Sequence, residues 1–239
     1  MTGAGGDTGE ERADGCTDGP TAGVAGPHGG CRVVAAGAPR GAAEAAVVAL
    51  HGRGTTAQGV VNLLEPVHRH GVTVLAPDAE RSRWLPYAAD APHEHNEPHL
   101  SSALAVVDAV VADAVDRLGL DRERVVLLGF SQGAGIAAEY AARNPGPSPV
   151  VALSGSLLGP DVDPGAYAGA DGTAAGVPVF LGVGADDPYV PVARMRATAD
   201  VLRALGADVT ERVYEGVGHE VTDDEFAWVD DLLAGLVGD

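Results

Sequence analysis

Residues 129–133 contain a serine whose surroundings suit covalent chemistry. They read Gly-Phe-Ser-Gln-Gly, follow the apolar run 124–128 and lead into a helix-like stretch that begins at Ala134. A strand, Gly-x-Ser-x-Gly and a helix in this order are typical of a nucleophile elbow. The turn is so tight that the residues two positions from Ser131 can carry almost no side chain, which accounts for both glycines. The pattern predicts that Ser131 is a nucleophile, although a chance glycine-rich turn could also produce it.

Two residues further along the chain could activate this serine. His219 follows the strand-like run 208–214, and Asp187 follows an earlier apolar strand. A serine hydroxyl attacks a carbonyl well only when a base takes its proton and a third group orients that base. The order Ser, Asp, His, each beyond the carboxyl end of a strand, is that of an α/β-hydrolase. We predict Ser131 as the nucleophile, His219 as general base and then acid, and Asp187 as the orienting group, with Asp186 as its competitor.

The oxyanion that forms during such a reaction needs two N–H donors. The backbone of Gln132, directly after the nucleophile, is the first candidate. The second is the backbone of Arg53 in His-Gly-Arg-Gly, which follows the apolar run 45–50. Gly52 and Gly54 would let this backbone approach a substrate. An ordinary tight turn is the alternative interpretation of the same four residues.

The stretch 79–99 is irregular and rich in Pro, His and aromatic residues. Loops of this length inside a compact domain are usually functional. Five side chains, either here or after the strand-like run 150–154, are predicted to line an acyl pocket, with ordinary core as the alternative. They are Trp84, Leu85, Tyr87, Leu157 and Leu158.

Residues 93–99, His-Glu-His-Asn-Glu-Pro-His, place three histidines and two glutamates close together. Imidazole and carboxylate at this density could hold Zn²⁺ or a similar ion. The spacing is not regular, so the alternative is a polar loop near the cleft in which Asn96 and Glu97 serve structurally. We assign no metal ligand and expect no cofactor.

Strand-like and helix-like segments alternate along the chain. This rhythm predicts an α/β fold, a doubly wound and mostly parallel sheet with helices on both faces and the active site at the carboxyl ends of its strands. The expected strands are 31–36 at an edge, 45–50, 72–75, 124–128, 150–154, 177–183 and 208–214. The expected helices are 57–70, a segment that begins at Ser101 or Ser102 and ends at Gly119, the segment after the elbow, 192–205 and 223–236.

The composition indicates how many domains the chain forms and where in the cell the protein is located. The chain of 239 residues is 46% hydrophobic, which favours one domain over residues 29–239. Residues 1–28 carry almost no large apolar side chains and are predicted to be a disordered arm. There is no secretory leader and no apolar run of membrane-spanning length, so we expect a cytoplasmic protein without membrane insertion. Cys16 and Cys31 are not expected to form a structural disulfide.

The charge balance is strongly acidic: 15 basic residues, all Arg, stand against 34 acidic ones, for a net charge of −19. Such a surface repels nucleic acid and anionic membranes. Concentrated salt screens this self-repulsion, so we predict a protein of a salt-accumulating, halophilic organism. Codon bias in a GC-rich genome is the alternative, and it explains the missing Lys but not the excess of Asp and Glu.

Five segments occur in one order that resembles the phospholipase/carboxylesterase family, which includes the acyl-protein thioesterases. They are Leu-His-Gly-Arg-Gly at 50–54, Asn-Glu-Pro with Leu-Ser-Ser-Ala-Leu at 96–104, Gly-Phe-Ser-Gln-Gly-Ala at 129–134, Asp-Pro-Tyr-Val-Pro at 187–191 and Gly-Val-Gly-His at 216–219. The resemblance covers roughly residues 30–236 and implies an α/β-hydrolase without a large cap domain or a cofactor. It also favours Asp187 over Asp186 and places the oxyanion hole at the backbone N–H groups of Arg53 and Gln132.

The sequence therefore predicts a serine carboxylic ester hydrolase that cleaves esters of small or medium acyl chains through an acyl-enzyme. Three alternatives stay open: an acyl thioesterase or lysophospholipase-type enzyme, a ligand-binding protein on a hydrolase scaffold, and a metal-dependent protein built on residues 93–99. The expected partner is a small ester or thioester. The oligomeric state is open, with a homodimer as one option.

Overall fold

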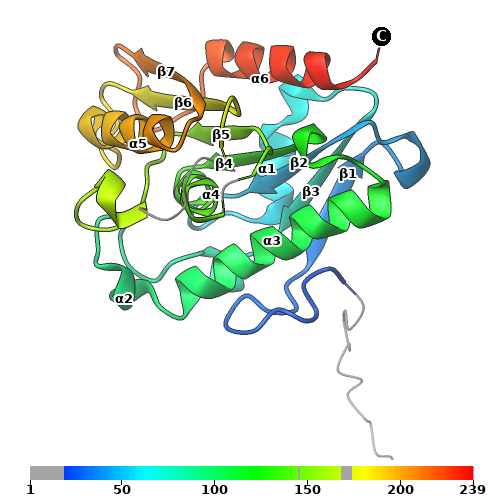
Figure 1. The fold of residues 1–239 in the computed structure, drawn as a ribbon, viewed down its shortest axis with the longest axis horizontal. Coiled ribbons are helices and arrows are strands. Elements are labelled where there is room, and N and C mark those ends of the chain that lie inside the picture. Colours follow the sequence, from blue (N-terminus) through cyan, green and yellow to red (C-terminus); the bar gives the residue numbers. More distant parts are fainter. Residues whose placement is uncertain (1–18, 145, 168–173, 239) are drawn as a thin grey trace, which may run out of the picture.

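Seven strands form one sheet in the order β1-β3-β2-β4-β5-β6-β7. The structure is a computed structural model that describes residues 19–144, 146–167 and 174–238 (Figure 1). Every neighbouring pair of strands is parallel except β1 and β3, which pair antiparallel at one edge. The strands are β1 Val33–Gly37, β2 Ala45–Leu50, β3 Val72–Pro77, β4 Val125–Phe130, β5 Val150–Leu153, β6 Pro178–Gly184 and β7 Asp208–Tyr214.

Helices cover both faces of this sheet, and each face has its own apolar layer. Side chains of α3, α4 and α5 pack on one face, and those of α1 and α6 pack on the other. In Figure 1, α6 and α3 accordingly lie on opposite sides of the strands. The helices are α1 Ala57–Leu63, α2 His93–Asn96, α3 His99–Leu118, α4 Gln132–Arg143, α5 Val192–Ala204 and α6 Asp223–Leu236, with short 3-10 turns at η1 Arg40–Ala42, η2 Glu65–Val67, η3 Glu80–Ser82, η4 Arg122–Arg124 and η5 Pro164–Tyr167. The predicted doubly wound α/β fold without a large cap is confirmed.

The central strands are continuous apolar runs because helices bury them from both sides. All six residues of β2 are buried, as are all four of β5. Since parallel strands run in one direction, the carboxyl ends of β4, β6 and β7 meet at one edge of the sheet. In Figure 1 this edge lies on the left, where α2 and the beginning of α3 are found. The predicted nucleophile, acid and base follow these three strands.

Two helices differ from their predicted bounds. The expected helix 57–70 stops at Leu63 and continues as the 3-10 turn η2, because Pro66 has no N–H to donate and disfavours helical geometry in the residue before it. Helix α3 begins at His99, with Pro98 in the capping position, rather than at Ser101 or Ser102. The Ser102 hydroxyl does not cap the helix, because it donates to the carbonyl oxygen of Ala25 (2.9 Å) and accepts the N–H of His28 (3.0 Å).

The segment before β1 also differs from its prediction. Residues 19–28, included in the predicted disordered arm, form turns that pack on the domain, and Thr21 and His28 are buried. The His28 ring donates through Nε2 to the carbonyl oxygen of Trp84 (2.9 Å) and accepts the N–H of Glu80 through Nδ1 (3.1 Å). The buried His28 ring and the Ser102 hydroxyl thus anchor this segment, which its polar composition did not indicate. The remainder of the predicted arm, residues 1–18 with Cys16, lies outside the described residues.

In the described ranges, no helix combines the length and the apolar character needed to cross a bilayer.

Candidate active site

Ser131 lies at the turn between β4 and α4 in a strained backbone conformation. Its φ is 56° and its ψ is −119°, a region that L-residues rarely adopt. A Cβ on Gly129 would overlap the backbone of Gly133, and one on Gly133 would overlap the carbonyl oxygen of Leu50. Both glycines are therefore required by contacts of the turn itself. The local geometry is that of a nucleophile elbow, which presents a serine hydroxyl at the carboxyl edge of the sheet.

The three predicted catalytic side chains form one hydrogen-bonded chain. Nε2 of His219 lies 2.8 Å from Oγ of Ser131, and Nδ1 of His219 lies 2.7 Å from Oδ2 of Asp187. The other carboxylate oxygen of Asp187 accepts the backbone N–H groups of Tyr189 (2.8 Å) and Val190 (3.0 Å). The Asp187 side chain is 0% exposed and that of His219 is 18% exposed. Three hydrogen bonds fix the position of this buried carboxylate beside the imidazole.

Asp186, the competitor for the acid role, is exposed at the surface. Its backbone N–H donates to the carbonyl oxygen of Val217 (3.0 Å), and the N–H of Ala185 donates to that of Tyr214 (2.8 Å). These two bonds tie the loop after β6 to the loop that carries His219. The geometry brings Asp187, and not Asp186, to the imidazole.

Two aromatic rings flank the His219 imidazole. The centroid of Phe130 lies 5.0 Å from it at a tilt of 38°, and that of Tyr189 lies 4.9 Å from it at 73°, an edge-to-face contact. Tyr189 is 75% exposed. Sequence reasoning did not single out Tyr189 as a site residue, although it lies two positions after Asp187 in the quoted Asp-Pro-Tyr-Val-Pro segment. Its exposed ring leaves an apolar surface directly beside the imidazole.

The loop with the second predicted oxyanion donor lies against the nucleophile. A Cβ on Gly52 would be 3.4 Å from Cβ of Ser131 and 3.3 Å from the ring of Phe130, so this backbone passes close to the hydroxyl. Among the described residues, neither the backbone N–H of Arg53 nor that of Gln132 has a hydrogen-bond acceptor. Gln132 is also the first residue of α4, where a helix presents free N–H groups and a positive dipole end. Both groups are thus available to an anionic oxygen near Ser131.

The side chains of the same two residues hold the neighbouring loop, a role that sequence reasoning missed. Nη2 of Arg53 donates to the carbonyl oxygens of Leu85 (2.8 Å) and Tyr87 (2.9 Å). The Gln132 amide donates to the carbonyl oxygen of Leu85 (3.1 Å) and accepts the N–H of Trp84 (2.8 Å). Burial lowers the pKa of Arg53 from its ordinary value, and the nearby Arg83 adds to this.

His51 joins the loop that carries Arg53 to the core. Its Nδ1 donates to the carbonyl oxygen of Gly52 (2.8 Å), its Nε2 accepts the N–H of Ala79 (3.0 Å), and its own carbonyl oxygen accepts the indole N–H of Trp84 (2.9 Å). Since one ring nitrogen donates and the other accepts, the imidazole must be neutral. Desolvation by burial lowers the pKa of His51, and it lowers that of His28 in the same way.

Four of the five predicted pocket residues lie in the core rather than in an exposed cleft wall. Trp84, Leu85, Leu157 and Leu158 are fully buried and belong to the apolar layer under α3, α4 and α5. The Trp84 ring lies against two histidine rings, 5.4 Å from His28 and 5.2 Å from His51. Tyr87, the fifth, is 55% exposed. The burial of these four fits the alternative interpretation as ordinary core, and their role in an acyl pocket stays a prediction.

The loop that carries Leu157 and Leu158 is held by two charged side chains that sequence reasoning also missed. Arg194 donates through Nη2 to the carbonyl oxygens of Leu157 and Gly159, both at 2.8 Å. The buried Glu139 accepts the N–H of Leu158 (3.1 Å), and it pairs with Arg143 at 2.5 Å. Only tertiary contact reveals these roles, because both side chains would read as exposed helix residues in the sequence.

The histidines of residues 93–99 point to separate partners. His93 lies 3.4 Å from a carboxylate oxygen of Glu139, the His95 ring lies 5.8 Å from that of Tyr87, and His99 lies 3.9 Å from a carboxylate oxygen of Glu80. Asn96 accepts the N–H of Tyr87 (3.1 Å), and Glu97 accepts the Ser101 hydroxyl (2.8 Å). Over the part of the chain that the structure describes, no three His, Cys, Asp or Glu side chains gather in a way that would hold a metal ion.

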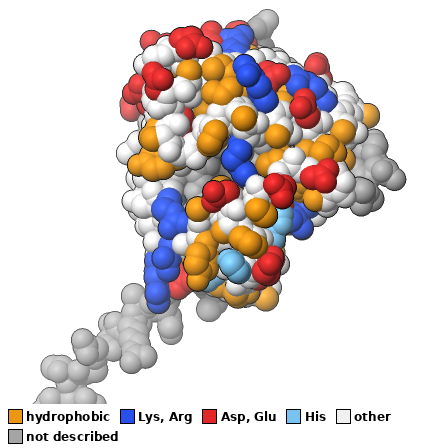
Figure 2. Space-filling view, turned by 90° about the vertical axis from the view of Figure 1, so that its left-hand side faces the viewer, with side chains coloured by type: hydrophobic (Ala, Val, Ile, Leu, Met, Phe, Trp, Pro, Cys, Tyr) orange, Lys and Arg blue, Asp and Glu red, His pale blue; other side chains and the backbone are white. Residues whose placement is uncertain are grey.

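The face to which the carboxyl ends of the strands point is mixed in character. Figure 2 shows hydrophobic side chains on this face, interspersed with both acidic and basic ones. No charge of a single sign dominates the described atoms of this view, in spite of the net charge of −19 of the whole chain. A neutral substrate with apolar groups is compatible with such a surface.

Comparison with known proteins identifies the family of this chain. A family model described as Phospholipase/Carboxylesterase matches residues 30–236. The chain is 25% identical to acyl-protein thioesterase 1 of Candida albicans over 82% of this chain and 93% of that protein. It is 31% identical to acyl-protein thioesterase 1 of Gibberella zeae, but that match spans 48% of this chain and only 49% of that protein. A solved structure of a phospholipase/carboxylesterase from Dyadobacter fermentans is 34% identical, covers 88% of this chain and 99% of its own, and superposes with a TM-score of 0.78.

Proposed function

This chain belongs to the phospholipase/carboxylesterase family and is a hydrolase of the esterase or thioesterase type, and we propose that it is a carboxylesterase with a Ser131–His219–Asp187 catalytic triad. One observation carries the proposal: the unbroken hydrogen-bonded chain from Oγ of Ser131 through the imidazole to the buried carboxylate. A ligand-binding protein on the same scaffold has no need of that geometry, nor of a strained serine at the elbow.

The proposed reaction begins with attack of Ser131 Oγ on the ester carbonyl carbon. Nε2 of His219 takes the hydroxyl proton, and Asp187 stabilises the imidazolium that forms. The backbone N–H groups of Arg53 and Gln132 donate to the oxyanion of the tetrahedral intermediate. When the intermediate collapses, the C–O bond to the leaving group breaks and Nε2 returns the proton to the departing alcohol. Water then attacks the acyl-enzyme by the same route and releases the carboxylic acid.

The finer choice between oxoester and thioester is part of the proposal. We favour oxoesters of small or medium acyl chains, the substrate class that the sequence predicts. The exposed Tyr189 ring beside His219 would meet the group that leaves on the imidazole side. The name of the Candida albicans relative keeps an acyl thioesterase as the second candidate.

Matched substrates test this choice. Hydrolysis rates would be measured for p-nitrophenyl esters from acetate to laurate, and for an oxoester and a thioester that share one acyl group. A maximum at a short or medium chain with a preference for the oxoester supports the proposal. A maximum at the longest chain with a preference for the thioester contradicts it in favour of the second candidate. Absence of turnover on every substrate, from protein of intact fold, would contradict the enzyme assignment itself.

Three further statements rest on the sequence and stay proposals. Residues 29–239 are proposed to form one hydrolase domain, supported by a single sheet that draws its strands from Val33 to Tyr214. A cytoplasmic location and adaptation to concentrated salt are proposed from the composition. The proposed partner is a small ester or thioester, with a homodimer as one option for the oligomeric state.

A further inference from the structure

The proposed mechanism fixes where the alcohol part of an ester lies. Oγ of Ser131 bonds to the carbonyl carbon, and Nε2 of His219, 2.8 Å from that oxygen, must later give its proton to the departing alcohol oxygen. Proton transfer of this kind needs the two heavy atoms within about 3.2 Å of each other. The leaving alcohol must therefore occupy the space directly beside the imidazole.

Tyr189 offers an accessible apolar surface at this place. Its ring centroid lies 4.9 Å from that of the His219 imidazole, with the two planes at 73°, and the residue is 75% exposed. Phe130, the other ring beside His219, packs on the apolar layer under α1 and α6 and lies close to Gly52. Of the two rings, that of Tyr189 is thus the one with most of its surface free to meet a leaving group.

The backbone of Tyr189 is held by the proposed catalytic acid. Oδ1 of Asp187 accepts the N–H of Tyr189 (2.8 Å), while its Oδ2 is bonded to the His219 imidazole (2.7 Å). Pro188 and Pro191 on either side restrict the backbone further. The position from which the Tyr189 ring projects is therefore fixed by the same carboxylate that orients the imidazole.

Exposed large apolar side chains are rare on this protein. In the described ranges only two are exposed, Tyr87 (55%) and Tyr189 (75%). They flank the elbow from opposite directions, because Tyr87 lies in the segment after β3 and Tyr189 in the loop after β6, on either side of β4 in the strand order. The Tyr87 carbonyl oxygen accepts from Arg53 (2.9 Å), a proposed oxyanion residue. Tyr87 therefore belongs to the oxyanion side of the site, and Tyr189 belongs to the imidazole side.

These observations give Tyr189 a role in substrate choice. We propose that its ring is the specificity-determining surface for the alcohol part of the ester and favours flat aromatic alcohols, an inference that rests on the proposed function. Contact between two aromatic rings is stabilised beyond the burial of their area, by an amount equivalent to about two- to ten-fold in binding. A saturated ring of the same size buries a similar area without this gain. The Tyr189 hydroxyl has no hydrogen-bond partner among the described residues, so we assign the role to the ring.

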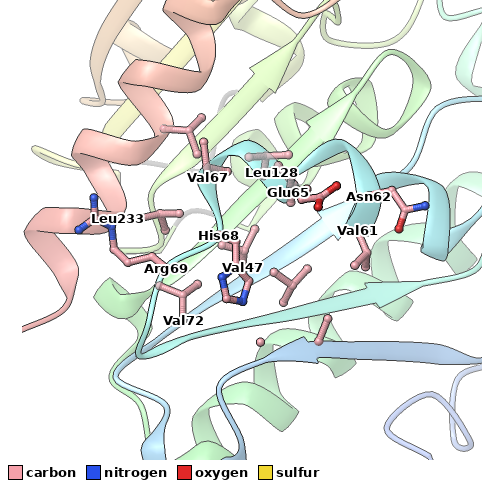
Figure 3. A pocket seen from close by; sticks show the side chains of 15 residues that line it. Val47, Val61, Asn62, Glu65, Val67, His68, Arg69, Val72, Leu128 and Leu233 are labelled. Atoms are coloured by element: carbon pink, nitrogen blue, oxygen red, sulfur yellow. The ribbon is translucent and has the colours of Figure 1, made fainter.

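The apolar groove between η2, α1 and α6 does not offer an alternative place for the alcohol (Figure 3). Its side chains include Val47 of β2, Val61 of α1 and Leu233 of α6, and none of the three triad residues lines it. An alcohol bound in this groove would not lie beside Nε2 of His219. The exposed Tyr189 ring meets that requirement.

The test compares benzyl acetate with cyclohexylmethyl acetate, whose alcohols have similar size and acidity but differ in aromaticity. Both esters form the same acetyl-enzyme, so the ratio of their kcat/KM values reports only the steps in which the alcohol is present. The ratio is measured for wild type, Tyr189→Ala, the conservative variant Tyr189→Phe and the matched variant Tyr87→Ala. Circular dichroism verifies that each variant is folded. Hydrolysis of p-nitrophenyl acetate by wild type and Ser131→Ala tests the proposed function separately.

We expect the ratio of kcat/KM for the benzyl ester to that for the cyclohexylmethyl ester to be about two- to ten-fold lower in Tyr189→Ala than in wild type. Tyr189→Phe should keep the wild-type ratio because the ring remains. Tyr87→Ala should keep it because Tyr87 lies on the oxyanion side. A merely structural effect of Tyr189→Ala on His219 would lower both kcat/KM values by one factor and leave their ratio unchanged.

An unchanged ratio in Tyr189→Ala would overturn the proposal, as would an equal fall of the ratio in Tyr189→Phe or in Tyr87→Ala. A wild type that hydrolyses p-nitrophenyl acetate but neither of the two matched esters would also overturn it, while the proposed function would stand. Hydrolysis of p-nitrophenyl acetate that is absent, or that does not depend on Ser131, would contradict the proposed function and the inference with it. The two failures can therefore be distinguished.

Discussion

Arg53 and Gln132 donate from their side chains to the same carbonyl oxygen, that of Leu85, at 2.8 Å and 3.1 Å. They are also the two residues whose backbone N–H groups we propose as the oxyanion donors. The two side chains thus bind the loop at residues 84–87. The same hydrogen bonds restrain Arg53 and Gln132 themselves, and so also their backbone N–H groups. This arrangement links the rigidity of a loop to the placement of the oxyanion hole.

We predict that Arg53→Ala and Gln132→Ala each lower kcat by about ten-fold with little change in KM. Neither substitution removes a backbone N–H, so any loss must come from misplaced geometry, and displacements of about 1 Å are known to cost up to 10²-fold. The double variant should lose less than the product of the single effects, because both side chains bind one carbonyl oxygen.

Gln58→Ala provides the control for this comparison. Gln58 is exposed in α1 and donates to Asn62 (2.8 Å), away from residues 84–87, so its removal should leave kcat unchanged. A loss of kcat in the double variant equal to the product of the two single losses would contradict coupling through Leu85.

Asp187→Asn is predicted to reduce kcat by about 10⁴-fold, since an amide in place of the carboxylate favours the wrong imidazole tautomer. Asp186→Asn is the matched control. Asp186 is exposed, and the hydrogen bond to His219 comes from Asp187, so the kcat of this variant should stay within about two-fold of wild type, as surface changes usually do. Steady-state kinetics on one ester measures both. A larger loss of kcat in Asp186→Asn than in Asp187→Asn would instead assign the acid role to Asp186.

Much of this site could be predicted because its signals are local. The elbow is recognisable from Gly129, Ser131 and Gly133, because the turn leaves no room for larger side chains at the two glycine positions. Continuous apolar runs locate the buried strands within about two residues. The acyl pocket could not be predicted in the same way. Trp84 and Leu157 are apolar whether they face a ligand or the core, and only the packing of distant elements decides between the two.

The side-chain roles of Arg53 and Gln132 also leave no trace in the sequence. Their acceptors are backbone carbonyl oxygens, which every residue possesses, so no residue type marks the partner. His28 illustrates the converse case. It lies in a polar, glycine-rich segment, yet its buried ring makes two hydrogen bonds to backbone groups of the domain and helps to pack residues 19–28 onto it.

Stability should decrease on acidification because two buried histidines have lowered pKa values. Burial holds the pKa of His28 and of His51 below 6.5 in the folded state, so the unfolded chain binds protons first as the pH falls. Their contribution is present in full above about pH 6.5 and is lost as the pH falls through that value toward the folded pKa values. Glu225 acts in the opposite sense, since burial raises its pKa.

The variant His28→Gln isolates one of these contributions. Its free energy of unfolding, measured in urea at pH 7.5 and pH 5.0, should depend less on pH than that of wild type. His68→Gln, at an exposed position, should keep the wild-type dependence. Equal pH dependence in all three proteins would contradict the role of His28.

Salt is predicted to stabilise the protein. With a net charge of −19 and no Lys, self-repulsion is screened as the Debye length falls from about 10 Å at 0.1 M to about 3 Å at 1 M. The thermal midpoint should rise steadily over this range of KCl, and the fold should weaken on dialysis to low salt. A midpoint independent of KCl would instead favour codon bias as the origin of the composition.

The most direct test of the central proposal is the rate of p-nitrophenyl ester hydrolysis by Ser131→Ala compared with wild type and with Ser101→Ala. Ser101 is an exposed serine at the start of α3, so its variant controls for the loss of a hydroxyl as such. We predict that Ser131→Ala loses about 10⁴-fold or more in kcat while Ser101→Ala retains the wild-type rate. Equal rates in wild type and Ser131→Ala would contradict the account, because the hydrogen-bonded chain to His219 and Asp187 would then serve no catalytic purpose.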